Sequence, residues 1–140
     1  MIKISILKGL TRDQYLHVSA LWELTGVGNV ERGDTFEAVN QTLYYGGRVI
    51  LIYDDEVPVG TVWLTHDFRR LYIHHMAVNP NFQNQGFGKI LMQEALLVAK
   101  ELNLQAKLEV HQDNPIAYEL YKSFGFKTLE GFITMIKRDI

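Results

Sequence analysis

The chain has 140 residues, of which 47% are hydrophobic and 21% are charged, and its formal net charge is −2 at pH 7. These values are ordinary for a globular protein with a single core, so we expect one domain over residues 1–140. The slightly acidic balance argues against a nucleic-acid partner, and the lack of cysteine excludes disulfides, thiolate catalysis and cysteine zinc sites. The sequence has no signal-peptide pattern and no apolar run of about 20 residues, so we expect a cytoplasmic protein without a membrane partner.

The N-terminal third of the sequence predicts one strand and two helices. Isoleucines alternate with polar residues at its start, as in a half-buried strand. Thr11 with Gln14, and Asp34 with Glu37, have the spacing of capping boxes, which open helices. The expected elements are a strand over 2–6, a helix from 12 to about 24, a flexible break at 26–29 and a helix from 35 to about 46.

Strand patterns and helix patterns alternate in the rest of the sequence. Runs rich in β-branched and aromatic residues are bounded by turn residues, and the helix after two glycines carries one apolar stripe at three- and four-residue spacing. The expected elements are strands over 48–53, 57–65 and 70–78, a helix over 87–102, a strand over 105–111, a helix over 115–124, and strands over 126–129 and 132–137.

A glycine-containing segment, residues 83–88, links the strand at 70–78 to the following helix and reads Gln-Asn-Gln-Gly-Phe-Gly. Glycine at a helix start lets backbone N–H groups approach an anion, and the helix dipole favours negative charge there. Two known phosphate loops are excluded. Gly88 is followed by Lys89 but then by neither Ser nor Thr, and Leu91 stands where a dinucleotide fingerprint needs glycine. The segment therefore predicts a phosphate-binding loop of another kind.

Two motifs carry a resemblance to one family. The pattern Gln-x-x-Gly-x-Gly from Gln83, preceded by Val-x-Pro, resembles the acetyl-CoA pyrophosphate loop of the GNAT N-acetyltransferase superfamily. Residues 114–126 are similar to its second signature, Asn-x-x-Ala-x-x-Leu-Tyr-x-x-x-Gly-Phe, at every marked position. The chain is thus identified as a member of this superfamily. The resemblance implies an α/β (α+β) domain, with a mixed, mostly antiparallel sheet of about seven strands and helices on both faces.

The resemblance also implies acetyl-CoA as the acyl donor. Backbone N–H groups of the loop would hold its pyrophosphate, and Gln83 stands where many relatives carry Arg. The end of the preceding strand would offer backbone groups to the pantetheine arm, with the Met76 N–H polarising the thioester carbonyl. Asn114 would touch the cofactor and also cap its own helix. The implied cofactor-binding residues are Met76, Ala77, Val78, Gln83, Asn84, Gln85, Gly86, Phe87, Gly88, Lys89, Asn114, Ala117 and Tyr121.

Tyr121 and His74 are the catalytic candidates. Tyr121 matches the tyrosine that relatives place near the cofactor sulfur as general acid, although it also lies on an apolar helical stripe typical of core residues. His74 stands where many relatives carry a glutamate base, and histidine titrates near neutrality; a purely structural role is the alternative. His75 is expected on the opposite sheet face unless a bulge intervenes, so the two adjacent imidazoles do not predict a metal site.

The function implied by the resemblance is transfer of the acetyl group of acetyl-CoA directly to the primary amine of a small molecule. Two alternatives stay open: acetylation of protein N-termini or lysines, and an acyl-CoA sensor without turnover. Glu23, Glu31 and Asp34 are candidates for attracting a cationic amine, or are ordinary surface charges. Trp22 and Trp63 would line the acceptor pocket or fill the core. A homodimer is compatible with the resemblance, since relatives often dimerise.

Overall fold

The computed structural model describes residues 1–28 and 30–140, so the predicted flexible break lies partly outside the described residues, at Asn29. The chain divides into two compact units, residues 1–109 and residues 110–140. Within the described residues, no helix has both the length and the apolar character needed to cross a membrane.

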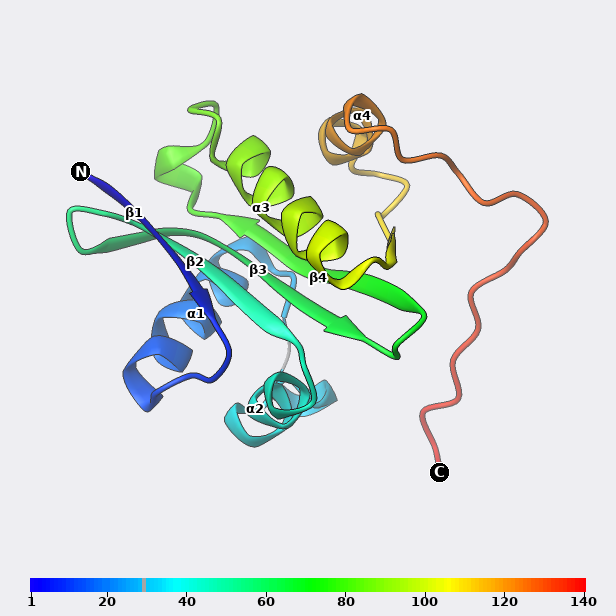
Figure 1. The fold of residues 1–140 in the computed structure, drawn as a ribbon, viewed down its shortest axis with the longest axis horizontal. Coiled ribbons are helices and arrows are strands. Elements are labelled where there is room, and N and C mark those ends of the chain that lie inside the picture. The colour runs from blue at the N-terminus through cyan, green and yellow to red at the C-terminus, as the bar shows by residue number, and fades with distance from the viewer. Residues whose placement is uncertain (29) are drawn as a thin grey trace. The chain divides into compact units, whose positions relative to one another are not determined.

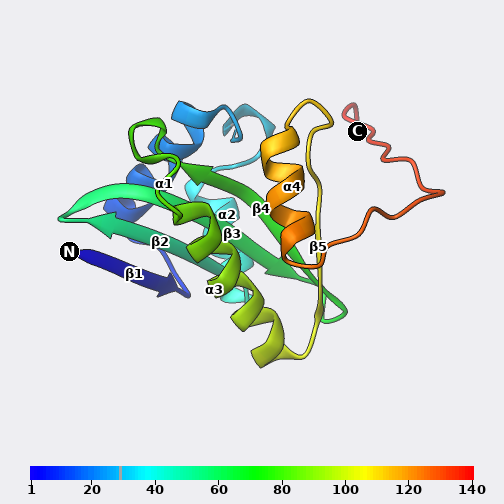
Figure 2. The same cartoon turned by 90° about the horizontal axis from the view of Figure 1, so that it is seen from above.

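The first unit is built on one sheet with the strand order β1-β2-β3-β4-β5 (Figure 1 and Figure 2). The first four strands pair antiparallel, and β5 pairs parallel with β4. This arrangement confirms the predicted mixed, mostly antiparallel sheet. The strands are β1 (Ile2–Leu7), β2 (Arg48–Asp54), β3 (Val57–His66), β4 (Arg70–Val78) and β5 (Gln105–Leu108).

Helices cover both faces of this sheet, as predicted. Helices α1 (Arg12–Thr25) and α2 (Phe36–Tyr44) pack on one face, and α3 (Phe87–Leu102) packs on the other (Figure 2). Two short 3-10 turns, η1 (Val30–Arg32) and η2 (Pro80–Phe82), precede α2 and α3. The sheet is therefore the middle layer of the first unit.

The helix starts follow from capping side chains, with one difference from the sequence prediction. Thr11 and Gln14 form the predicted reciprocal capping box, with bonds of 2.9 and 3.1 Å. At α2 the cap is Thr35, whose hydroxyl accepts the Ala38 N–H at 3.1 Å, and not Asp34 as predicted. Both residue types are good N-caps, so the spacing alone does not choose between neighbours. Asp34 is therefore not the cap of this helix, and its carboxylate contacts His75.

Two apolar layers hold the sheet between its helices. Because successive side chains on a strand alternate, the buried residues of β2 divide between the faces: Val49 and Leu51 face α1 and α2, whereas Ile50 and Ile52 face α3. Each fully buried aliphatic side chain contributes about 1.5–3 kcal/mol. The buried residues of the layer under α1 and α2 are Leu10, Tyr15, Val18, Leu21, Trp22, Val39, Leu43, Val49, Leu51 and Ala77.

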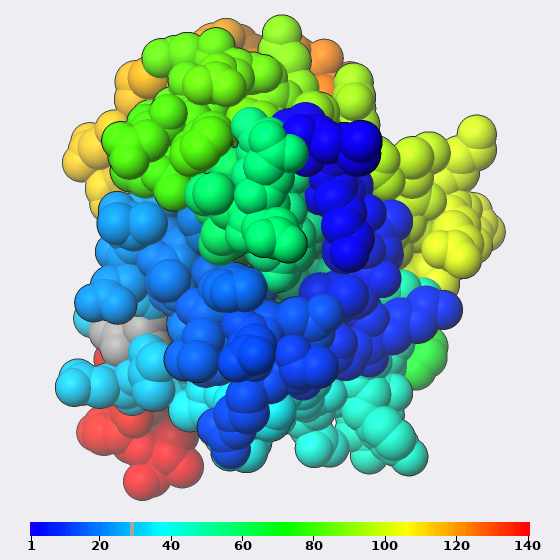
Figure 3. Space-filling model, turned by 90° about the vertical axis from the view of Figure 1, so that its left-hand side faces the viewer, coloured from blue at the N-terminus to red at the C-terminus, as the bar shows by residue number. Residues whose placement is uncertain are grey.

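The N-terminus is tied to the first hairpin. The Met1 ammonium donates to the carboxylate of Asp55 and also pairs with Asp54. In the space-filling view, the N-terminal residues in dark blue lie beside the turn between β2 and β3 (Figure 3). The Met1 ammonium and the Asp55 carboxylate are highly exposed, so their contact adds little stability.

The second unit contains α4 (Pro115–Ser123) and an extended C-terminal segment. The two strands predicted over 126–129 and 132–137 are wrong: this part of the described chain joins no ladder, and its large apolar side chains, such as Ile133 at 87% exposure, face solvent. Ordering an extended chain costs conformational entropy, so a segment of alternating apolar and polar residues forms a strand only where a partner strand supplies hydrogen bonds and burial. An isolated hairpin has only marginal stability. The sheet has five strands rather than about seven, and β5 ends at Leu108, before the predicted residue 111.

Candidate functional site

The predicted phosphate loop lies between the end of β4 and the start of α3. The Asn79 N–H donates to the Val59 carbonyl at 2.8 Å, and the Asn79 side chain accepts the Asn81 N–H at 3.0 Å, so η2 is anchored to β3. Gln83, which stands where many relatives have Arg, donates from Nε2 to the Val78 carbonyl at 3.3 Å. This side chain therefore closes the loop onto the strand end.

The first turn of α3 has the features expected of an anion site. Gly86 is the N-cap, with a left-handed φ of +87°, and among the residues that the structure describes no side chain caps this end of the helix. Asn84 also has a positive φ, of +65°. The first N–H groups of a helix lack intrahelical acceptors, so here they remain available to an anion at the positive end of the helix dipole. The loop residues Gln83, Asn84, Gln85, Gly86, Phe87, Gly88 and Lys89 thus occupy the predicted place.

A bulge interrupts β4 next to this loop. The β3–β4 register shifts between Thr61, which faces Ala77, and Trp63, which faces His74, and His75 has a φ of +49°. Two β4 residues, His75 and Met76, therefore oppose a single β3 residue. The bulge turns His75 onto the face that carries His74, so the expectation of opposite faces does not apply. Among the residues that the structure describes, no cluster of three or more metal-ligating side chains is present.

The strand β4 also separates from β5 at this point. The parallel ladder runs from Arg70–Gln105 to Ile73–Leu108 and stops, while β4 continues to Val78. The end of β4 is the segment predicted to offer its backbone to the pantetheine arm, Met76, Ala77 and Val78. The Ala77 side chain is buried in the layer under α1, which leaves backbone groups for any such contact.

His74 is held in a half-buried aromatic setting. Its Nε2 lies 2.7 Å from the Thr65 hydroxyl, and its ring lies 5.2 Å from the ring of Trp63. Burial, together with the neighbouring His75, lowers the pKa of His74 to about 4, against a smaller opposing effect of Asp34. His74 is therefore neutral at neutral pH.

His75 pairs with Asp34, which comes from the segment before α2. The distance from Nε2 to the Asp34 Oδ2 is 2.9 Å, and the Tyr15 hydroxyl donates to the Asp34 backbone carbonyl at 2.6 Å. Edge-on contact with Trp22, at 5.0 Å between ring centroids, fixes the imidazole from another side. A carboxylate only accepts hydrogen bonds, so the Nε2 atom of His75 carries a hydrogen.

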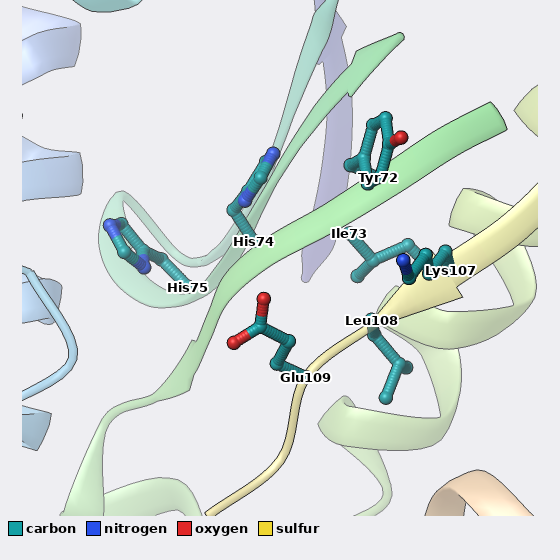
Figure 4. Close-up of a pocket in the computed structure, with 7 residues that line it drawn as sticks. All are labelled: Tyr72, Ile73, His74, His75, Lys107, Leu108 and Glu109. Carbon is teal, nitrogen blue, oxygen red and sulfur yellow. The ribbon is translucent and has the colours of Figure 1, made fainter. Parts of the chain in front are cut away.

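A pocket of about 300 Å³ opens where the strands separate (Figure 4). Both imidazoles line it from β4, and the carboxylate of Glu109 points from the end of β5 toward that strand. Trp63 faces His74 across the ladder and packs against the α1 and α2 layer, so the imidazoles lie on that side of the sheet. The full lining is Tyr72, Ile73, His74, His75, Lys107, Leu108 and Glu109.

Three predicted site residues belong to the second unit. Asn114 caps α4 as predicted, accepting the Ala117 N–H at 3.2 Å. Tyr121 lies on the same helix, with its ring 6.2 Å from that of Phe126. Burial raises the pKa of the Tyr121 phenol above its ordinary value of 10.0, so the hydroxyl is protonated at neutral pH. The roles of these residues toward a cofactor stay predictions.

The sequence did not predict the Asp34–His75 pair or the acidic side chain in the pocket. The adjacent histidines and the acidic residue before α2 were visible signals, but the contact joins residues 41 positions apart and depends on the bulge. Of the other acidic candidates, Glu23 and Glu31 are exposed. Trp22 is 2% exposed and fills core, as one of its two predicted alternatives stated.

Comparison with known proteins agrees with the two sequence motifs. The model of the Acetyltransferase (GNAT) family matches residues 16–126. The uncharacterized N-acetyltransferase CgeE of Bacillus subtilis is 30% identical over 100 residues, which cover 66% of this chain and 39% of CgeE. The peptidyl-lysine N-acetyltransferase YjaB of Salmonella typhimurium is 29% identical over 101 residues, covering 72% of this chain and 64% of YjaB. The chain spans less than two thirds of the length of each of these relatives.

A solved structure shares the fold. A predicted acetyltransferase of Clostridium acetobutylicum, crystallised with acetyl-CoA, superposes with a TM-score of 0.78 at 17% identity, and the match covers 97% of this chain and 96% of the other. The family model covers most of the chain, including both signature motifs. The chain therefore belongs to the GNAT acetyltransferase family.

Proposed function

We propose that the chain is an N-acetyltransferase that moves the acetyl group of acetyl-CoA directly to the primary amine of a small molecule, with residues 1–140 acting as one domain. One observation carries this proposal: β4 bulges and separates from β5 in the region between the uncapped N-terminus of α3 and a pocket lined by two imidazoles. An anion site and a proton-accepting site on one strand suit a reaction between an acyl-CoA and an amine.

In this proposal the chain supplies binding, orientation and proton transfer. Backbone N–H groups at the start of α3 hold the pyrophosphate, and the Met76 N–H polarises the thioester carbonyl. Asn114 and Ala117 contact the cofactor, and Tyr121 protonates the departing thiolate. Because burial raises its pKa, the Tyr121 phenol is protonated at neutral pH, as a proton donor must be. Two imidazoles, those of His74 and His75, are then the candidates for the general base.

The pocket supports a small acceptor. Its volume of about 300 Å³ is at the lower end of the range for small-molecule sites. Glu109 lines it, so its carboxylate is the group that would attract an ammonium, against the opposing charge of Lys107 in the same lining. A second candidate function is acetylation of a peptidyl lysine, favoured by the name of the relative YjaB. A lysine side chain presents the same ammonium group on a longer chain.

Thiol release from acetyl-CoA tests the proposal across polyamines, aminoglycosides, amino acids and short lysine peptides. Turnover with one small-amine class, and weaker turnover with peptides, is the expected result. Preference for peptides would select the second candidate. If calorimetry shows acetyl-CoA binding while no amine turns over, the chain is a sensor and the proposed activity is wrong.

A further inference from the structure

The bulge on β4 gives the pocket two imidazoles in different settings. The ring of His74 is bonded to a neutral hydroxyl, that of Thr65, and lies against Trp63. The ring of His75 is bonded to a carboxylate, that of Asp34, and lies against Trp22. Their ring centroids are 6.3 Å apart, and Figure 4 shows the rings directed to different sides. The two imidazoles therefore differ in their hydrogen-bond partners and in their aromatic neighbours.

The pair with Asp34 prepares His75 for proton transfer. Because Nε2 donates to the carboxylate, the lone pair of the neutral ring lies on Nδ1. Within the described part of the chain, Nδ1 of His75 has no hydrogen-bond partner, and the residue lines the pocket. If Nδ1 takes a proton, the imidazolium is stabilised by the charge-assisted bond to Asp34. The side chains of the pair are 25% and 17% exposed, so water screens this interaction only partly.

His74 lacks such stabilisation. Its partner is a hydroxyl, and burial with the adjacent imidazole disfavours its charged form. Other groups that line the pocket are Lys107 and Glu109 at the β5 side and Tyr72 on β4. None of these is fixed by an ion pair to a carboxylate in the way that His75 is.

We propose that Nδ1 of His75 accepts the proton of the acceptor amine, and that Asp34 is the positioning residue that holds its tautomer and stabilises its imidazolium. This inference rests on the proposed N-acetyltransferase function. The amine nitrogen forms a bond to the acetyl carbon, the carbon–sulfur bond breaks, and the sulfur keeps the electron pair. Nδ1 takes one proton from the nitrogen and the sulfur gains one. An acceptor that arrives as an ammonium releases one net proton to solvent.

Three glutamine or asparagine variants test the inference with the best acceptor found for the wild type. H75Q removes the proton acceptor, H74Q is its matched neighbour, and D34N keeps an acceptor for Nε2 but removes the charge. Formation of acetylated amine is measured, with kcat and KM determined separately for acetyl-CoA. H17Q, on α1 and bonded to Tyr53, controls for the loss of an imidazole elsewhere.

We expect H75Q to lower kcat at least about 100-fold and D34N at least about tenfold, with the KM for acetyl-CoA changed less than about threefold. H74Q should lower kcat less than about tenfold. Imidazole added to the medium should raise the rate of amine acetylation by H75A and leave that of H74A unchanged, which a merely structural role of His75 would not produce. Urea unfolding checks that each variant folds; if H75Q does not, D34N decides by the same kcat criterion.

Two results would overturn the inference alone. The first is that the wild type is active and both H75Q and D34N keep its kcat. The second is that kcat decreases more in H74Q than in H75Q. A wild-type chain that acetylates no amine would overturn both the proposed function and the role of His75, so the two failures are distinguishable.

Discussion

Acid should destabilise the folded protein through His74. Burial lowers its pKa from 6.5 to about 4, so the unfolded chain binds a proton on this residue more readily than the folded chain does. Above the unfolded pKa of 6.5, the neutral ring makes its full contribution to the free energy of unfolding. This contribution decreases as the pH falls from 6.5 toward 4, and it is lost below that value.

The size of this effect follows from the two pKa values. A tenfold change in proton affinity corresponds to about 1.4 kcal/mol, so the complete effect is about 3 kcal/mol. Between about pH 7 and about pH 4.5, linkage gives a loss of about 2 kcal/mol in the free energy of unfolding from this one residue. Such a loss is a large fraction of the stability of a typical small domain.

Urea unfolding followed by tryptophan fluorescence measures the effect at both pH values. The glutamine of H74Q cannot be protonated. The loss of unfolding free energy between the two pH values should therefore be about 2 kcal/mol smaller in H74Q than in the wild type. H111Q serves as the control, because the His111 side chain is 73% exposed, and it should behave as the wild type does. Equal losses in wild type and H74Q would refute the argument that burial keeps His74 neutral.

Three other substitutions test the loop, the packing under the pocket and the proposed acid. G86A should raise the KM for acetyl-CoA about fivefold or more, because a Cβ at the φ of +87° costs about 1–2 kcal/mol and shifts the helix start; an unchanged KM would contradict the loop assignment. G28A should lower the free energy of unfolding by about 1–3 kcal/mol in a urea titration, because its Cβ would lie 2.7 Å from that of Trp22; wild-type stability would show that this contact relaxes freely. Y121F should lower kcat about 100-fold while calorimetry gives unchanged acetyl-CoA binding, and full activity would exclude Tyr121 as the general acid.

Local patterns in the sequence were enough to predict most elements of the first unit. The capping box at Thr11, the amphipathic stripe of α3 and the glycines that begin it act over a few residues, so they are readable without the fold. The same holds for the Asn114 cap of α4. The strands predicted over 126–137 failed for the opposite reason: alternation describes a strand only if a partner strand is present.

The sequence by itself determined the family, the place of the glycine-containing loop before α3 and the presence of histidines on the strand before that loop. Only the tertiary structure decided which contacts those histidines make. The bulge in β4 places His75 on the same face as His74, and this depends on register with β3 rather than on β4 alone. Thr35 caps α2, and Asp34, which precedes it, instead meets His75 on the face of the sheet that α1 and α2 cover. Such contacts join distant segments, and no local preference encodes them.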